Sequence, residues 1–113
     1  MTENRSKPDF IFPGITEYHD NNFNTSLLTM LGAKSTCKDR WRQVLAEADR
    51  IEHKHLLTLE AAISVHQTDE MVSKNLQLVV PKSIHKTYTL LQRDWLMDVN
   101  GFIDLLNQKQ GHM

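Results

Sequence analysis

The sequence predicts an α/β fold, with a mostly parallel or mixed central sheet flanked by helices. Short apolar segments rich in β-branched residues alternate with segments of helical periodicity, as in units where a helix connects two parallel strands. One amphipathic stripe lies between two of the predicted strands, and apolar residues recur at helical spacing in the last third of the chain. No internal repeat or linker interrupts the chain. We therefore expect residues 1–113 to form a single domain.

The first third of the chain predicts two strands separated by a polar loop. Residues 8–14 form a short aromatic run closed by Pro-Gly, which predicts a strand and a turn. Residues 15–25 are rich in Asn, Asp and His without a sustained period, which is typical of a loop. Residues 26–34 are apolar but too short for periodicity to separate helix from strand. We favour a strand, because a stronger helical signal follows directly.

That helical signal covers residues 35–51, where Ser35 or Thr36 can cap the free N–H groups of the first turn. The apolar residues of this segment recur at the spacing of one helix face. They are Trp41, Val44, Leu45, Ala48 and Ile51. This stripe is the clearest in the sequence.

The remaining elements continue the alternation. Residues 54–60 predict a strand, residues 68–75 a short polar helix or turn, and residues 76–80 a buried strand stopped by Pro81. Residues 84–91 and 94–108 predict one or two closing helices packed on a face of the sheet. The apolar positions of the last segment are Trp95, Leu96, Val99, Phe102, Ile103 and Leu106.

Composition limits the classes of function. The formal net charge is −1, which argues against a domain that is basic throughout and binds nucleic acid non-specifically. The single cysteine, Cys37, cannot form an internal disulfide, and no signal peptide is evident, so we expect a reducing, cytoplasmic setting. No stretch approaches the roughly 18 apolar residues of a membrane helix, so we expect no membrane function.

A local basic patch stands out against this neutral background. Four cations and one acid occur in residues 34–42, hereafter the basic segment, at a predicted strand end and helix start. Lys38, Arg40 and Arg42 lie at a helix N-terminus, which itself attracts anions, so the segment can contact phosphates or base edges of DNA. A solvated helix face is an equally good interpretation of the pattern, although cations at a helix start oppose the dipole.

Metal-dependent cleavage of a phosphodiester also needs carboxylates, whose oxygens bind the ion. It usually needs a lysine as well, which steers water or steadies developing charge. Asp9 follows Pro8 on the first predicted strand, Lys34 ends the second, and Glu47 lies on the following helix. Taken singly, Asp9 is more often a turn residue and Glu47 a surface glutamate. His53 and His55, two positions apart without a third ligand, are weak support for zinc and fit a polar strand entrance better.

The same residues resemble a known family. The run Lys-Ser-Thr-Cys-Lys-Asp-Arg-Trp-Arg-Gln at 34–43 is flanked by Pro-Asp-Phe-Ile-Phe-Pro-Gly at 8–14, His-Leu-Leu-Thr-Leu at 55–59 and Leu-Val-Val-Pro at 78–81. Together these segments closely resemble the C-terminal catalytic domain of EcoRII-type restriction endonucleases, within the PD-(D/E)XK nuclease superfamily. The resemblance extends over nearly the whole chain and implies a restriction-endonuclease-like core.

The resemblance also implies roles for individual residues. Asp9 matches the metal-binding aspartate of the Pro-Asp motif, and Lys34 matches the catalytic lysine. Gly32 stands where most of the superfamily keeps a second acid. In this branch that acid has moved to the next helix, at the position of Glu47, which requires the helix to lie across the strand end. The ion implied is Mg²⁺, held by Asp9 and Glu47, without an organic cofactor.

Further matches concern DNA. Lys38 and Arg40 match residues expected to read guanines of the recognition site, a task for which arginine and lysine donors are well suited. Tyr18 matches a tyrosine near the active site. The implied reaction is Mg²⁺-dependent hydrolysis of double-stranded DNA at CCWGG-type sites in restriction and modification, by a homodimer.

One departure from the family is length, because only eight residues precede Asp9. We therefore expect a partial catalytic domain, with a core incomplete at its N-terminus. The competing hypothesis is a non-catalytic α/β DNA-binding or interaction module that keeps the fold and the basic helix.

Overall fold

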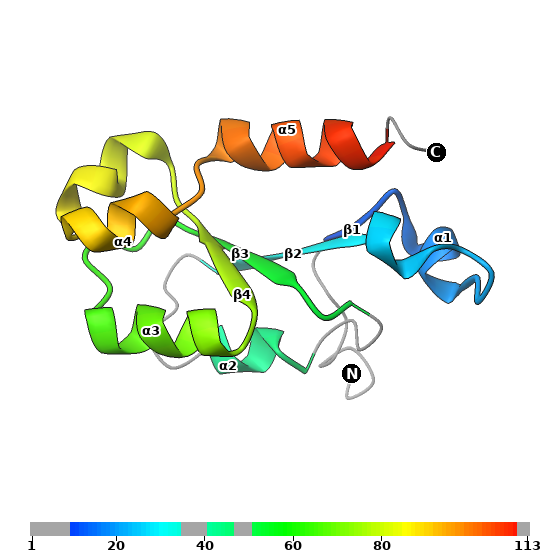
Figure 1. Ribbon diagram of the computed structural model, residues 1–113, viewed down its shortest axis with the longest axis horizontal. Coiled ribbons are helices and arrows are strands. Elements are labelled where there is room, and N and C mark those ends of the chain that lie inside the picture. Colours follow the sequence, from blue (N-terminus) through cyan, green and yellow to red (C-terminus); the bar gives the residue numbers. More distant parts are fainter. Residues whose placement is uncertain (1–9, 35–40, 47–50, 111–113) are drawn as a thin grey trace.

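A computed structural model describes residues 10–34, 41–46 and 51–110 (Figure 1). Asp9, Lys38, Arg40 and Glu47 lie outside the described residues. The strands are β1 (Phe10–Phe12), β2 (Thr29–Lys34), β3 (Lys54–Thr58) and β4 (Leu76–Val79). The α-helices are α1 (Ile15–His19), α2 (Trp41–Val44), α3 (Val65–Ser73), α4 (Leu90–Trp95) and α5 (Val99–Gln110), and the 3-10 helices are η2 (Thr25–Leu27) and η4 (Lys82–Thr87).

The four strands form one mixed sheet in the order β1-β2-β3-β4. β1 pairs antiparallel with β2, whereas β2, β3 and β4 run parallel. Parallel neighbours need a crossover connection, and the described helices α2 and α3 lie in the two connections. The predicted α/β class with a mostly parallel or mixed sheet is therefore confirmed.

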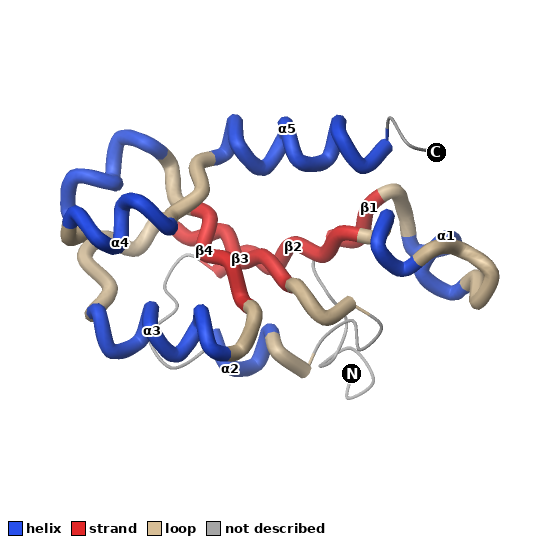
Figure 2. The backbone as a smooth tube through the Cα atoms, in the orientation of Figure 1, coloured by secondary structure: helices blue, strands red, loops and turns tan. Residues whose placement is uncertain are grey.

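Helices cover both faces of the sheet, with α2 and α3 on one face and α5 on the other (Figures 1 and 2). The larger core lies beneath α2 and α3, where Trp41, Val44 and Met71 are fully buried against the strands. The predicted stripe is confirmed at Trp41, Val44 and Ile51. The helix itself is described only over Trp41–Val44, and Ile51 is buried from a segment without regular structure, immediately before β3.

The second core lies beneath α5, where Phe102 packs against Leu31 of β2 and Val79 of β4. This confirms that a closing helix covers a face of the sheet. The predicted start of that helix at residue 94 was wrong, because Trp95 ends α4 and the backbone then extends through Leu96. Met97 forms a parallel bridge with Val79, so its backbone pairs with the sheet instead of forming part of a helix.

Other boundaries also differ from the sequence prediction. Residues 15–25 were predicted as loop, but α1 and the start of η2 occupy part of them. The polar helix predicted from residue 68 begins at Val65, where the Ser64 hydroxyl accepts the N–H of Gln67. Residues 84–91 contain most of η4 and the start of α4, which Thr89 caps reciprocally with Gln92. No helix among the described residues is long and apolar enough to cross a membrane.

The interface between α5 and the sheet contains two basic side chains, of which His55 is buried and Lys109 is half-buried. His55 of β3 is 5% exposed and packs edge-on against Phe102, with ring centroids 5.2 Å apart. Its Nδ1 has no hydrogen-bond partner among the described residues. Lys109 of α5 donates from Nζ to the Leu28 carbonyl at 2.8 Å and to the Thr29 hydroxyl at 2.7 Å. Burial, and next the Lys109 charge, lower the pKa of His55 from 6.5 to about 4.

Acidification should therefore destabilise the fold through His55. The unfolded chain takes up this proton near pH 6.5, whereas the folded chain takes it up only near pH 4. The contribution of His55 to stability is complete above pH 6.5 and falls by about 3 kcal/mol as the pH drops to 4. Urea denaturation of wild type and His55→Gln between pH 7 and pH 4 measures this loss. The exposed His19→Gln variant is the matched control and should keep the wild-type slope. Equal slopes in all three proteins would show that His55 is not the responsible group.

Candidate active site at the strand ends

The carboxyl ends of β2 and β3 meet at one edge of the sheet. Lys34, the last residue of β2, pairs in register with Thr58, the last residue of β3. An open cavity of about 290 Å³ lies here, lined by Ala33, Lys34, Leu57, Thr58 and Leu59. Ligands of open α/β sheets bind outside the carboxyl ends of parallel strands. We call this place the strand-end site.

Hydrogen bonds hold the chain in place just beyond β3. The Thr58 hydroxyl accepts the backbone N–H of Glu60 at 3.1 Å. The Glu60 carbonyl in turn accepts the hydroxyl of Tyr88 at 2.6 Å. Thr58 and Tyr88 are buried, whereas Leu59 between the two anchored residues is 63% exposed. The strand-end site therefore combines a lysine and an exposed apolar side chain with a backbone that is fixed at several points.

Helix α2 approaches β2 very closely at Gly32. A Cβ atom on Gly32 would lie 3.2 Å from Cγ2 and 3.4 Å from Cγ1 of Val44, which is fully buried. A valine in a helix has essentially one side-chain rotamer, so it cannot turn away. An acid at position 32 would therefore displace the helix. The close packing places Val44 of α2 against β2, two residues before Lys34.

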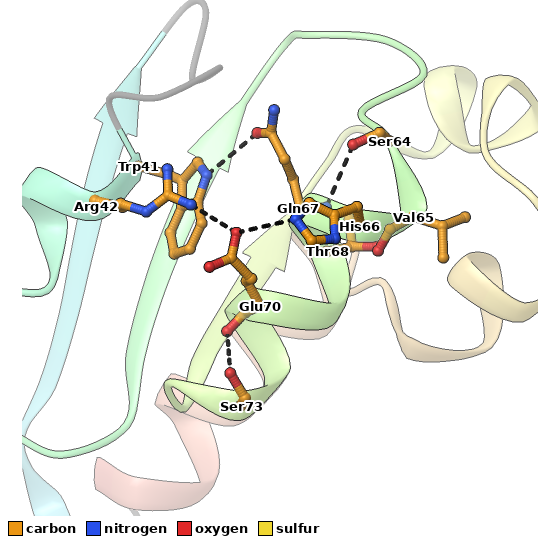
Figure 3. A network of polar contacts seen from close by, with 9 residues as sticks. All are labelled: Trp41, Arg42, Ser64, Val65, His66, Gln67, Thr68, Glu70 and Ser73. Carbon is orange, nitrogen blue, oxygen red and sulfur yellow. Dashed lines mark hydrogen bonds and ion pairs between the residues drawn. The ribbon is translucent and has the colours of Figure 1, made fainter.

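Polar contacts join α2 to α3 (Figure 3). The guanidinium carbon of Arg42 lies 4.5 Å from the ring centroid of buried Trp41, whose Nε1 donates to Oε1 of Gln67 at 3.2 Å. Arg42 Nη2 donates to Oε1 of Glu70 at 2.6 Å. His66 Nε2 lies 3.8 Å from the same Glu70 oxygen. We call these five residues the α2–α3 network.

The structure separates the predicted site residues that it describes. Lys34 is half-buried at the strand-end site, and Arg42 belongs to the α2–α3 network on the same side of the sheet as Gly32. Tyr18 lies on α1 and packs against the larger core. Since α1 follows Phe12, which pairs with Thr29, Tyr18 and Lys34 belong to opposite ends of β2, separated by roughly 16 Å of strand.

Two partners of the predicted site were missed by sequence reasoning. Glu70 and Gln67 contact the basic segment from a helix more than 20 residues away. No local pattern signals such a contact. Among the described residues, no group of three or more His, Cys, Asp or Glu side chains could hold a metal ion. His55 lies on β3 as predicted, but it is buried against Phe102 beneath α5 instead of at a polar strand entrance.

The profile of the family described as EcoRII C terminal matches residues 1–103. The chain belongs to this family. Among curated relatives of this EcoRII C-terminal chain, the type II restriction enzyme EcoRII of Escherichia coli is 48% identical over 103 residues, which are 91% of this chain and 26% of the relative. The type II restriction enzyme SsoII of Shigella sonnei is 32% identical over 73 residues, 63% of this chain and 23% of that protein.

Solved structures give the same fold assignment. Metal-depleted Ecl18kI in complex with uncleaved DNA has a TM-score of 0.68 and 23% identity to the EcoRII C-terminal chain. The alignment covers 89% of this chain and 33% of Ecl18kI. A complex of the same protein with modified DNA gives the same TM-score. The restriction-endonuclease-like fold is thereby established, while the chain spans about a quarter to a third of the length of these relatives.

The close approach at Gly32 predicts a measurable strain. Gly32→Ala should lower the free energy of unfolding by about 1 kcal/mol, because overpacking outweighs the smaller entropy of the unfolded chain. Val44→Ala opens space for the new methyl group. Denaturant titrations should therefore show that Gly32→Ala costs less in a Val44→Ala background than in wild type. As a matched control, the exposed Val72→Ala should leave the cost of Gly32→Ala unchanged, and equal costs in all backgrounds would contradict the predicted contact.

Proposed function

We propose that this chain is the partial catalytic domain of a Mg²⁺-dependent endonuclease that hydrolyses double-stranded DNA at CCWGG-type sites in restriction and modification. The observation that supports this proposal most directly is the position of Lys34 at the carboxyl end of a parallel strand, in a chain of the EcoRII C-terminal family. The relatives are type II restriction enzymes, which supports the same reaction class. We place this reaction in the cytoplasm.

Asp9 and Glu47 are the proposed ligands of Mg²⁺. Carboxylate oxygens are hard donors that suit this ion, and the crowding at Gly32 favours a second acid supplied from the helix instead of the strand. When bound, the ion supplies Lewis acidity to the scissile phosphate and lowers the pKa of water. Lys34, fixed at the end of β2, stabilises negative charge that develops on the phosphate or orients the attacking water. Tyr18 remains a prediction from the resemblance.

The basic segment is the proposed DNA contact. Lys38 and Arg40 read guanines through the O6 and N7 acceptors in the major groove, and Arg42 binds a backbone phosphate. The DNA complexes of the structural neighbour Ecl18kI support duplex DNA as the partner. A homodimer suits a nearly palindromic target, because two-fold symmetry presents the same residues to each half-site.

A second candidate is a DNA-binding or interaction module without turnover. The observation that favours it is the placement of Arg42, which stacks on Trp41 and pairs with Glu70 at the surface, since a cation held there can bind DNA without a metal. Both candidates predict binding of duplex DNA. Only the endonuclease predicts metal-dependent cleavage that depends on Lys34.

Cleavage of a supercoiled plasmid that carries CCWGG sites distinguishes the two candidates. With Mg²⁺ the wild type should give discrete products, and EDTA should abolish them. Lys34→Ala should lower the cleavage rate by about 10²-fold or more, because the phosphate loses a fixed charge partner. Asp9→Ala should remove cleavage through loss of the metal. Gel analysis of time courses measures each rate.

The control variant is Lys74→Ala, which removes a lysine of the same charge from the end of α3, beside the start of β4. It should cleave like wild type. Intact plasmid from cooperatively melting wild-type protein, together with binding of a CCWGG duplex, would contradict the endonuclease and support the binding module. Cleavage that persists in Lys34→Ala would contradict the assignment of the catalytic lysine.

A further inference from the structure

Trp41 and Glu70 hold the guanidinium of Arg42 in a defined position. Its central carbon lies over the indole of Trp41, 4.5 Å from the ring centroid, and Trp41 is fully buried and donates to Gln67. Nη2 of Arg42 meets the Glu70 carboxylate at 2.6 Å. The contact with the ring and the charge-assisted hydrogen bond come from different directions. Together they fix the position of the guanidinium.

The carboxylate of Glu70 is nevertheless exchangeable. The side chains of Arg42 and Glu70 are 47% and 34% exposed, so water and ions reach the pair. Ion pairs with this exposure are weak and are screened by salt. A competing anion can therefore replace Glu70, whereas the stacking on Trp41 would persist.

Carboxylate and phosphate present similar oxygen acceptors to a guanidinium, which binds both in the same manner. Arg42 is the last cation of the basic segment, and its helix packs on β2 two residues before Lys34. We propose that Glu70 occupies the place of a DNA phosphate: on the duplex, Arg42 exchanges the Glu70 carboxylate for a backbone phosphate. This inference rests on the proposed function and adds a regulating residue to the DNA site.

The exchange has a consequence for affinity. Each phosphate contact at Arg42 must compete with the Glu70 carboxylate of the same protein. Phosphate contacts carry no sequence information. Glu70 therefore weakens binding to every duplex by the same factor and leaves the preference for one sequence unchanged.

The test compares Glu70→Gln with wild type in EDTA, on a CCWGG duplex and on an unrelated duplex of equal length. Fluorescence anisotropy over a range of salt concentrations should show both affinities rising by about five-fold. The logarithm of affinity should also fall more steeply with the logarithm of salt, because salt no longer weakens a competing ion pair. The slope should be steeper by less than about 0.9, the value for one phosphate contact. Glu70→Asp, which keeps the charge, should restore wild-type behaviour.

Two controls separate this exchange from a general effect of charge. Asp69→Asn removes the same charge from the neighbouring position of α3, on the side that faces α4, and should change both affinities less. In an Arg42→Ala background, Glu70→Gln should have no effect on affinity or salt slope. Thermal melts verify that all variants fold.

Unchanged or weaker binding by folded Glu70→Gln would overturn the inference while leaving the proposed function intact. A gain that persists in the Arg42→Ala background, or that Asp69→Asn reproduces in full, would overturn it as well. If folded wild-type protein binds neither duplex, the proposed function itself is wrong, and the inference falls with it.

Discussion

The close packing of α2 on β2 is the constraint on which the rest of the site depends. Gly32 has no side chain, so Val44 can lie directly on the strand two residues before Lys34. Trp41, one turn earlier, is buried in the same core and orients Arg42. One glycine thus brings the helix that carries Arg42 against the strand that carries Lys34. A side chain at position 32 would crowd Val44.

The sheet positions Lys34, whereas the α2–α3 network positions Arg42. Backbone pairing between β2 and β3 fixes Lys34 opposite Thr58 and is insensitive to salt and pH. The contacts of Arg42 lie at the protein surface and respond to solvent ions. A group proposed to act on the reacting phosphate is therefore held rigidly, while a group proposed to bind the DNA backbone is held by a weak and reversible ion pair.

Strands were predictable from sequence because burial on both faces leaves short apolar runs, as in residues 78–80. At Met97, prediction from the sequence pattern fails. Its apolar side chain fits the helical spacing of its neighbours, but its backbone bonds with β4, a choice that only the tertiary structure determines. Lys34 was predictable for the site through the sequence match. Glu70 was not, because its partner Arg42 is 28 residues away in sequence.

The segment that includes Met97 also decides how copies of this sheet could associate. Met97 accepts the N–H of Val80 and donates to the carbonyl of Leu78, and Gln77 binds the Trp95 carbonyl. The outer side of β4 is thereby occupied along its carboxyl half. Chain growth by edge-to-edge strand addition requires two open sides on every molecule. Strand addition at β4 is therefore blocked over the half of the strand that the segment around Met97 covers.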